Sequence, residues 1–383
     1  MQCGRAFKSL ENHLKSVLWH AVSEFGLKLM KPGSAISRTT SIIIIVVVVI
    51  AAIAASVSYQ MLATKSSQSV NLVIATLPIA DSVPLFVAYQ EGYFAAQGLN
   101  VTLDVVASPP LVNSAVEKGS AQLGLNSVAF CATANEAGFP LKFVTPVDMA
   151  AYPNGTAQGV YLPNVSPHAI AVLASSGIKN LTDLEGKSIG VNALASSSQT
   201  NVEYLLAHYG VNLSSISWTV LPYPSSVAAL EQKRVDAIQI IQPFITEMLM
   251  ANQSGPTAGQ FRIIGDDDNY GIPDSGLITG YLGLSSWISA HGDIVNKFIA
   301  AYTKGTETTK NNQTLAKQIL VNKLGLNSTV ASQLYLPVYW DTTVPYISIQ
   351  KQIDILLQFG ALKNKSDNAT LLVDPTYFKL GPP

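Results

Sequence analysis

Polar side chains stand at the starts of two expected helices, each directly after an expected buried strand. Asp81 and Ser82 follow the first of these strands. The second is followed by four polar residues, Ser196, Ser197, Ser198 and Gln199. The free N–H groups of a helix start, together with hydroxyls, can hold an anion or a polar oxygen. The Asp81 carboxylate would instead suit an amine or a ring N–H, and helix capping is the alternative role for these residues.

Other candidate ligand contacts follow the ends of further expected strands. Ser108 follows the second strand, and Asn126 and Ser127 follow the third. Tyr223 and Tyr270 are expected to stack on a flat ligand or, alternatively, to pack in a core. Asp148 is a candidate for bracing a hinge.

Residues that would support catalysis, metal binding or nucleic-acid binding are scarce. The part of the chain after Lys65 has two arginines, Arg234 and Arg262, so a bidentate clamp on a sulfonate or phosphate is not expected. Its three histidines are far apart in sequence, and Cys131 is its single cysteine. The formal net charge is −1, which argues against nucleic acid. We therefore expect no cofactor, no metal and no enzymatic activity.

Strand and helix patterns alternate after residue 70, as in an open α/β sheet. The chain divides into two similar units, one starting near Asn71 and one near Ser188. Each unit has a helix that ends at glycine, then a strand, a turn containing proline, another helix and a small apolar strand. Two such units in one chain predict two lobes with a cleft between them.

An uncharged apolar segment precedes these units. Residues 42–63 would form a helix about 33 Å long, enough to cross a bilayer. The preceding 38 residues carry six Lys or Arg against two Glu, which predicts that the N-terminus stays inside the cell. We favour a retained membrane anchor over a cleaved signal peptide, and in both cases the rest of the chain lies outside.

The Asn-x-Ser/Thr acceptor motif for N-glycosylation is more frequent than composition alone would give, and it is absent before the apolar segment. This excess predicts an exported glycoprotein. The acceptor asparagines are Asn100, Asn154, Asn164, Asn180, Asn212, Asn252, Asn312, Asn327, Asn364 and Asn368.

Several segments together resemble the nitrate/sulfonate/taurine-type substrate-binding proteins of ABC importers, whose fold is shared with the thiamine-pyrimidine synthase-like proteins. The resemblance rests on "PIADSVPLFVAYQEGYFAAQGLNV", "EKGSAQLGL", "IKNLTDLEGKSIGVNALASSSQTNVEYLLAHYGV", "VAALEQKRVDAIQIIQPF" and "DPTYF", which spread over residues 71–378. The family usually has Glu-Pro where this chain has Gln242-Pro243, so Gln242 joins the candidate ligand contacts.

The resemblance implies a type II periplasmic-binding-protein-like α/β fold, with open mixed sheets in two lobes and two crossings between them. The ligand would lie at the carboxyl ends of the strands, where open α/β sheets bind ligands in general. The expected divisions are a leader (1–41), an anchor or signal (42–63), lobe 1 (66–163 and 272–383) and lobe 2 (164–271).

The expected function is that of a monomeric solute receptor on the extracellular face of the cell membrane, or secreted if the N-terminal segment is cleaved. It would bind a small polar or heterocyclic ligand and deliver it to an ABC permease and its ATPase. One alternative is a membrane-anchored sensory domain. Another is an enzyme like the thiamine-pyrimidine synthases, although the cysteine-rich iron motif of those proteins has no counterpart here.

Overall fold

A computed structural model describes residues 69–149, 166–253, 259–267, 277–334, 336, 343–364 and 368–382. The chain forms two compact units, Met1–Ser67 and Gln68–Pro383. The first unit, with the expected leader and membrane segment, lies outside the described residues. None of the helices within the described ranges is both long enough and apolar enough to span a bilayer.

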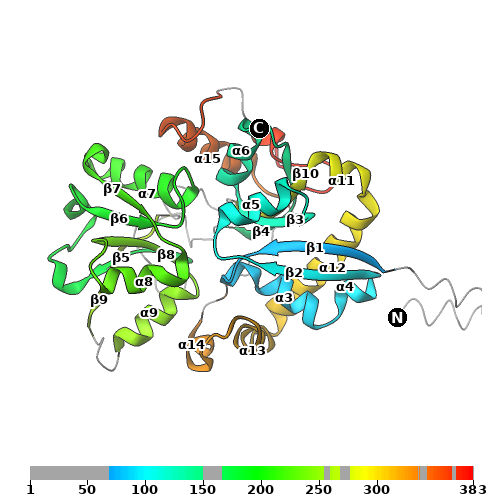
Figure 1. Cartoon of the computed structure of the whole chain (residues 1–383), viewed down its shortest axis with the longest axis horizontal. Helices are drawn as coiled ribbons and strands as arrows, with labels where there is room; N and C mark the ends of the chain where they lie inside the picture. Colours follow the sequence, from blue (N-terminus) through cyan, green and yellow to red (C-terminus); the bar gives the residue numbers. More distant parts are fainter. Residues whose placement is uncertain are drawn as a thin grey trace, which may run out of the picture. The chain divides into compact units, whose positions relative to one another are not determined.

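The first of two five-stranded sheets belongs to lobe 1 (Figure 1). Its strands are β1 (Val70–Thr76), β2 (Leu99–Val105), β3 (Leu123–Ser127), β4 (Leu141–Met149) and β10 (Leu277–Leu284). They lie in the order β2-β1-β3-β10-β4. Strand β1 is parallel to β2 and β3, whereas β10 is antiparallel to β3 and β4.

The second sheet belongs to lobe 2, drawn in green in Figure 1. Its strands are β5 (His168–Leu173), β6 (Ser188–Val191), β7 (Ser217–Val220), β8 (Ala237–Ile241) and β9 (Phe261–Gly265). The order β7-β6-β8-β5-β9 repeats the arrangement of the first sheet, with β5 as the antiparallel strand. Two mixed sheets of equal topology confirm the predicted α/β fold class of periplasmic-binding-protein type.

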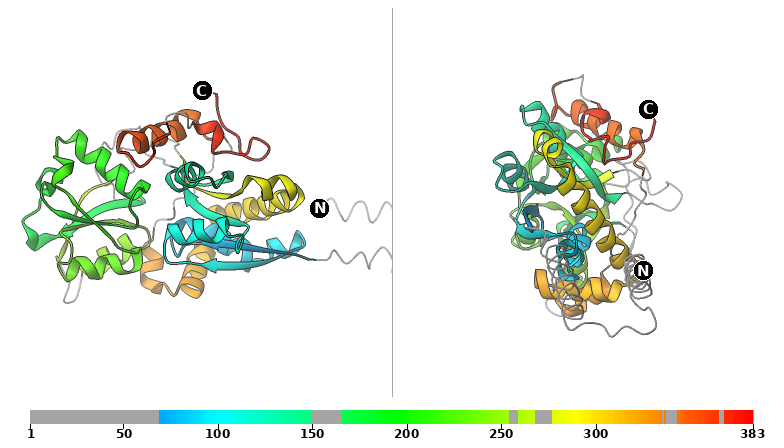
Figure 2. Two further views of the ribbon diagram at one scale, coloured as in Figure 1. Left: turned by 45° about the horizontal axis from the view of Figure 1, so that its top comes forward. Right: turned by 90° about the vertical axis from the view of Figure 1, so that its right-hand side faces the viewer.

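Helices pack against both sheets (Figure 2). Lobe 1 contains η1 (Ala80–Ser82), α3 (Val83–Gln90), α4 (Tyr93–Ala96), α5 (Pro109–Glu117), α6 (Val128–Glu136), α11 (Ser285–Ala290), α12 (Gly292–Asn311), α13 (Gln313–Leu324), α14 (Ser328–Gln333), α15 (Tyr346–Gln358) and η7 (Ala369–Leu371). Lobe 2 contains η3 (Ala174–Ser176), η4 (Leu181–Leu184), α7 (Ser197–His208), η5 (Leu213–Ser215), α8 (Tyr223–Glu231) and α9 (Phe244–Gln253).

Several elements differ from the expectation from sequence. The sequence pattern of residues 83–98 predicts one helix that ends at Gly98. This stretch is instead split into α3 and α4, because Gly92 adopts a left-handed φ of 70° that ends one helix before the next begins. The sequence pattern predicts the two crossings between the lobes within residues 151–177 and 266–287, but these ranges contain strands β5 and β10. Helix α6 is not predicted from the sequence. The expected lobe boundaries at 163/164 and 271/272 fall in 150–165 and 268–276, outside the described residues.

An aromatic core supports the carboxyl ends of the lobe 1 strands. Phe298 stacks on Phe94 and on Tyr302, and the Tyr281 ring meets Tyr302 edge-on at 5.1 Å between centroids. Both tyrosines are at most 1% exposed. Because interiors are packed as densely as crystals, this cluster holds β10 and α12 rigidly beneath the residues that follow β1.

The two lobes contact each other through side chains as well as through the chain crossings. Tyr204 of α7 meets Phe359, which directly follows α15, edge-on, and the Lys351 ammonium lies 5.4 Å from the Tyr204 ring centroid. Tyr223 and Ile241, which also belong to lobe 2, pack into the core of lobe 1. The lobes therefore meet over a substantial packed contact in this conformation.

Candidate ligand-binding site

Two hydrogen bonds join the lobes at the carboxyl ends of their strands. The Ser197 hydroxyl, at the start of α7, donates to the Ser127 hydroxyl at the end of β3 over 3.3 Å. The backbone N–H of Ala80, after β1, donates to the Gln242 carbonyl oxygen after β8 over 3.2 Å. These contacts bring the strand ends of the two lobes together, and we take this junction, called the crevice below, as the candidate site.

Asp81 is a carboxylate at this crevice, and it is half-buried. The Thr279 hydroxyl, on β10, donates to its Oδ2 over 2.8 Å. Burial raises the pKa of the phenols of Tyr281 and Tyr302 well above the usual range, and the nearby negative charge of Asp81 adds to the rise. The carboxylate thus lies close above the aromatic core, in a position held by Thr279.

Ser82 is fully buried, so it faces the interior rather than water. Its hydroxyl donates to the Leu77 carbonyl oxygen over 2.7 Å and lies 2.8 Å from the Thr76 hydroxyl. Ser82 occupies the N-cap position of α3 without a side-chain cap bond. In this conformation its hydroxyl fixes the turn between β1 and α3.

The serines after β6 form a closed network. The Ser198 hydroxyl donates to Asn192 Oδ1 over 2.5 Å, and the Ser196 hydroxyl donates to the Ala193 carbonyl over 2.6 Å. The two serine hydroxyls are 2.8 Å apart. The other side of the Asn192 amide, Nδ2, donates to the Tyr223 hydroxyl over 2.7 Å. The side chains of Asn192, Ser196, Ser198 and Tyr223 are buried and polar, and they form hydrogen bonds with one another.

Ser197 differs from its two neighbours because its side chain is half-buried and reaches the other lobe. Ser196, the N-cap residue of α7, makes no side-chain cap bond. The N-cap serines of α5 and α6, Ser108 and Ser127, also make none. The side-chain hydrogen bond that would cap a helix is therefore not formed at the starts of α5, α6 and α7.

Asn192 was missed by the sequence analysis, although a signal for it existed. It follows the last residue of β6 directly, and polar residues near strand ends are the pattern that marks Ser108, three residues beyond β2, and Asn126, the last residue but one of β3, as candidates. Asn126 has a comparable role, since its Nδ2 donates to the Pro109 carbonyl over 3.0 Å and to Asn113 Oδ1 over 2.9 Å. Asn126 thus fixes the backbone at the start of α5, whereas Asn192 fixes the side chains of Ser198 and Tyr223.

Two further candidates lie mainly within packed regions. Tyr223 stacks on Phe244 with 6.3 Å between ring centroids and is 6% exposed. Gln242 is buried, and its Oε1 accepts a hydrogen bond from the Thr246 hydroxyl over 2.8 Å. Tyr223 therefore fits the core-packing alternative. Tyr270 lies outside the described residues.

A polar cluster lies where the chain passes between the lobes. His168 Nδ1 is 3.6 Å from Asp267 Oδ2, and Gln239 Nε2 is within hydrogen-bond distance of both side chains. Asp148, the predicted hinge residue, is 1% exposed at the end of β4. Asp148 and Asp267 lie close in sequence to residues 150–165 and 268–276, which connect the lobes, so each lobe has a buried carboxyl side chain near such a connection.

The Gln199 side chain links the crevice to a carboxyl group one helical turn further on. Its Oε1 accepts from the Ala195 N–H over 2.8 Å, and its Nε2 donates to Glu203 Oε1 over 2.9 Å. Burial raises the pKa of Glu203 to about 6, against the opposing effect of the Gln199 hydrogen bond. Gln199 thus orients the loop that carries the serines.

Replacing Glu203 with glutamine is expected to stabilise the protein at pH 7.5 but not at pH 4. A pKa raised above the ordinary 4.5 means that protonation favours the folded state, and this stabilisation is lost as the pH rises through about 6. We expect a gain on the order of 1 kcal/mol, because contact with water reduces the full effect. Urea unfolding at both pH values measures it; an equal change at both would contradict the burial argument.

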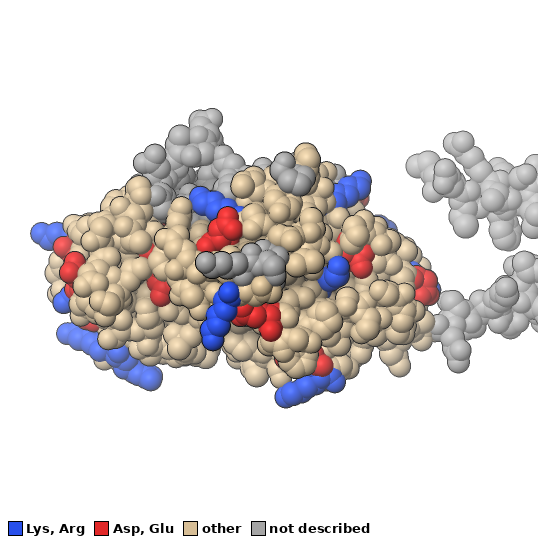
Figure 3. Space-filling model, turned by 90° about the horizontal axis from the view of Figure 1, so that it is seen from above, with Lys and Arg blue, Asp and Glu red and all other residues tan. Residues whose placement is uncertain are grey.

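Other features of the described residues offer no alternative site. Within those ranges, no group of three His, Cys, Asp or Glu side chains is placed to hold a metal. Cys131 is fully buried, and burial raises the pKa of its thiol well above the usual range. Lys, Arg, Asp and Glu are scattered over a mostly uncharged surface on the face in Figure 3.

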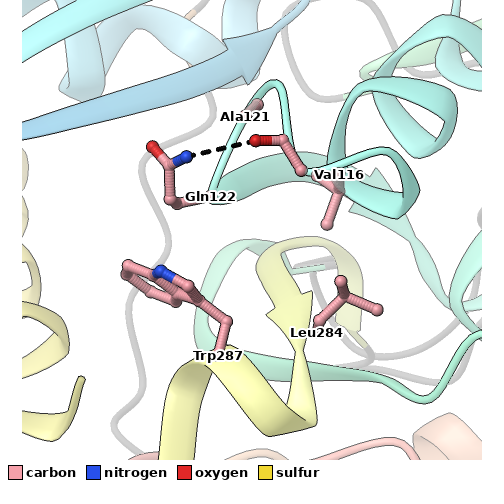
Figure 4. Close-up of a pocket in the computed structure, with 6 residues that line it drawn as sticks. Val116, Ala121, Gln122, Leu284 and Trp287 are labelled. Atoms are coloured by element: carbon pink, nitrogen blue, oxygen red, sulfur yellow. Dashed lines mark hydrogen bonds between the residues drawn. The ribbon is translucent and has the colours of Figure 1, made fainter. Parts of the chain in front are cut away.

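A small pocket, shown in Figure 4, lies at the opposite end of the first sheet from the crevice. It adjoins the start of β3 and the end of β10, and Gln122 Nε2 donates to the Gly119 carbonyl beside it over 3.4 Å. Its walls carry no charged side chain. It is lined by Val116, Gly119, Ala121, Gln122, Leu284 and Trp287.

The two mixed sheets and the double crossing implied by their strand order give the chain a periplasmic-binding-protein-like fold. The chain belongs to the NMT1/THI5-like family, whose model matches residues 79–152 and 160–316. The resemblance predicted from the sequence is confirmed by this match and by the structural similarities.

Relatives with known names fall into two groups. A 4-amino-5-hydroxymethyl-2-methylpyrimidine phosphate synthase of Saccharomyces cerevisiae is 23% identical over 248 residues, covering 63% of this chain and 67% of the yeast protein. The alkanesulfonate-binding protein SsuA of Xanthomonas axonopodis, solved with MOPS bound, has a TM-score of 0.63 at 18% identity, covering 81% and 98% of the two chains. The nitrate-binding protein NrtA of Synechocystis has a TM-score of 0.63 at 12% identity, covering 80% and 85%.

Proposed function

We propose that this protein is an extracytoplasmic solute receptor that binds a small ligand between its lobes. The observation that supports this most strongly is the Ser127–Ser197 hydrogen bond, because it brings two strand-end hydroxyls from different lobes within 3.3 Å. A ligand that contacts both sides favours the closed state by its higher affinity for that state. The fold similarity to solute-binding proteins agrees with this role.

The chemistry of the crevice favours a neutral, zwitterionic or heterocyclic ligand. The segments that follow the strand ends contain hydroxyls, amides and one carboxylate, but neither Lys nor Arg. These segments are residues 77–82, 106–108, 126–128, 192–199, 221–223 and 242–244. The Asp81 carboxylate would accept a hydrogen bond from an amine or a ring N–H of the ligand. The backbone N–H groups of Ser197 and Ser198, at the start of α7, would donate to a ligand oxygen.

We further propose that residues 42–63 anchor the protein, or direct its export if cleaved, and that it works as a monomer delivering its ligand to an ABC permease and its ATPase. The Staphylococcus aureus ligand-binding component of an ABC-type import system has the same fold, with a TM-score of 0.65 at 15% identity. A glycosylated surface would compensate for the low content of charged residues, which is 12%.

The yeast relatives support a second candidate, an enzyme of pyrimidine synthesis. We propose that the chain is not an enzyme, because the single cysteine after residue 65 is packed in the core and the histidines after residue 65 stand apart in sequence. The sensory alternative would require a signalling partner on the inner side of the membrane.

A thermal-shift screen tests the receptor function. The purified protein is heated with sulfonates, nitrate, taurine, pyrimidine precursors of thiamine, and flavins. A ligand at 100 times its Kd is expected to add about 2.7 kcal/mol to the free energy of unfolding. Recovering a hit unchanged after incubation separates a receptor from an enzyme, since an enzyme would convert it. A screen with no shift from any compound would count against this ligand class.

A further inference from the structure

Five of the described acceptor asparagines of the Asn-x-Ser/Thr motifs fall into two structural classes. Asn180, Asn212, Asn312 and Asn327 are exposed, and each lies at the N-cap of the helix that follows it. Asn252, at the end of α9, is half-buried instead. The exposed class and Asn252 use different atoms of the side-chain amide for their hydrogen bonds.

In the exposed class the hydrogen bonds go to the side-chain oxygen. Oδ1 of Asn180, Asn212 and Asn327 accepts the backbone N–H two residues on, at 3.0, 3.2 and 2.8 Å. At Asn180 and Asn212 the hydroxyl of the motif's third residue donates to the same oxygen. The motif thus doubles as a capping turn. Capping through Oδ1 leaves the fold independent of what is attached to Nδ2.

At Asn252 both halves of the amide hold the structure together. Nδ2 donates to the Phe261 carbonyl oxygen over 3.1 Å, and Oδ1 accepts the Phe261 N–H over 2.9 Å. This pair joins the end of α9 to the first residue of β9. A sugar on Nδ2 would have to leave a half-buried position and would disturb that pairing.

The exposed acceptors also avoid the ligand crevice of lobe 2. Asn180 and Asn212 precede β6 and β7, so they lie at the amino ends of parallel strands, opposite the crevice. None of the strand-end segments that form the crevice contains an Asn-x-Ser/Thr motif. Glycans on these two positions would leave the ligand path open.

We propose that Asn180, Asn212, Asn312 and Asn327 carry N-linked glycans, and that Asn252 is unmodified. This rests on the export included in the proposed function. In the transfer, Nδ2 forms a bond to the anomeric carbon of a lipid-linked oligosaccharide, and the bond from that carbon to the lipid phosphate oxygen breaks. The lipid phosphate leaves with the electron pair, and Nδ2 gives up one of its two protons.

Glycopeptide mass spectrometry of the full chain, purified from the membranes of the cells that make it, tests the assignment. Sugar is expected on the four exposed asparagines and not on Asn252. Asn180→Asp keeps a capping oxygen but has no amide nitrogen, and Thr182→Ala removes the motif but keeps the Asn180 cap. Each variant should lose the mass of one glycan. The matched control, Ser254→Ala, removes the Asn252 motif and should leave the mass of the attached sugar unchanged.

Protease treatment of intact cells, done in parallel, separates the two claims. If the protease digests the receptor part but all four asparagines are bare, or if Asn252 carries sugar, the assignment is overturned while ligand binding stands. If the receptor part is protected inside the cell, export fails and the assignment fails with it. Digestion of the receptor part, together with sugar on the four exposed asparagines and none on Asn252, supports both export and the glycan assignment.

Discussion

Replacing Asp81 with alanine is expected to weaken ligand binding by about 1–3 kcal/mol, or roughly 5- to 150-fold in Kd. The carboxylate is a half-buried charge at the crevice, and Thr279 fixes its position. A hydrogen bond to a charged group contributes more than a neutral one, so its loss should dominate the effect of single substitutions in the crevice. Calorimetric titration with a hit from the thermal-shift screen measures the change.

The matched control for this substitution is Thr279→Val, which keeps Asp81 but removes the hydroxyl that orients it. We expect a smaller loss of affinity than for Asp81→Ala. Far-UV circular dichroism establishes that both variants are folded. Unchanged affinity in a folded Asp81→Ala protein would show that Asp81 does not contact the ligand.

Replacing Asn192 with alanine is expected to lower the free energy of unfolding by about 2–4 kcal/mol. The substitution removes the hydrogen bonds that Asn192 makes with the buried hydroxyls of Tyr223 and Ser198. Tyr223→Phe removes only one of these bonds and should cost about 1 kcal/mol. Urea unfolding compares the two variants, and equal losses would contradict the proposed network.

The regular elements near the candidate site were predictable because their patterns are local. A continuous apolar strand followed by small polar residues placed Asp81 and Ser197 at helix starts, and the structure has both there. Strand β5 was missed because "HAIAVL" follows a stretch rich in Pro and Gly, although its apolar run fits a strand buried on both faces. Strand β10 was missed because "LITGYLGLSSW", which follows the second unit, was assigned to the crossing back to lobe 1.

The partners of the site residues were beyond prediction for a different reason. Asp81 and Thr279 are 198 residues apart, so no spacing in the sequence connects them. The roles of Ser196 and Ser198 depend on the backbone path of a loop that turns them towards Asn192 rather than into the crevice. Sequence position therefore identifies which segments reach the crevice, whereas the fold determines which side chains are used within it.

The proposal that the ligand enters between the lobes is tested most directly by joining them covalently. Ser127→Cys combined with Ser197→Cys places two thiols where the hydroxyls are 3.3 Å apart, and the native Cys131 is fully buried. Oxidation of the empty double variant should abolish binding of the screened ligand in calorimetric titration, and reduction should restore it. Binding of equal affinity in the oxidised and reduced proteins would contradict a site between the lobes.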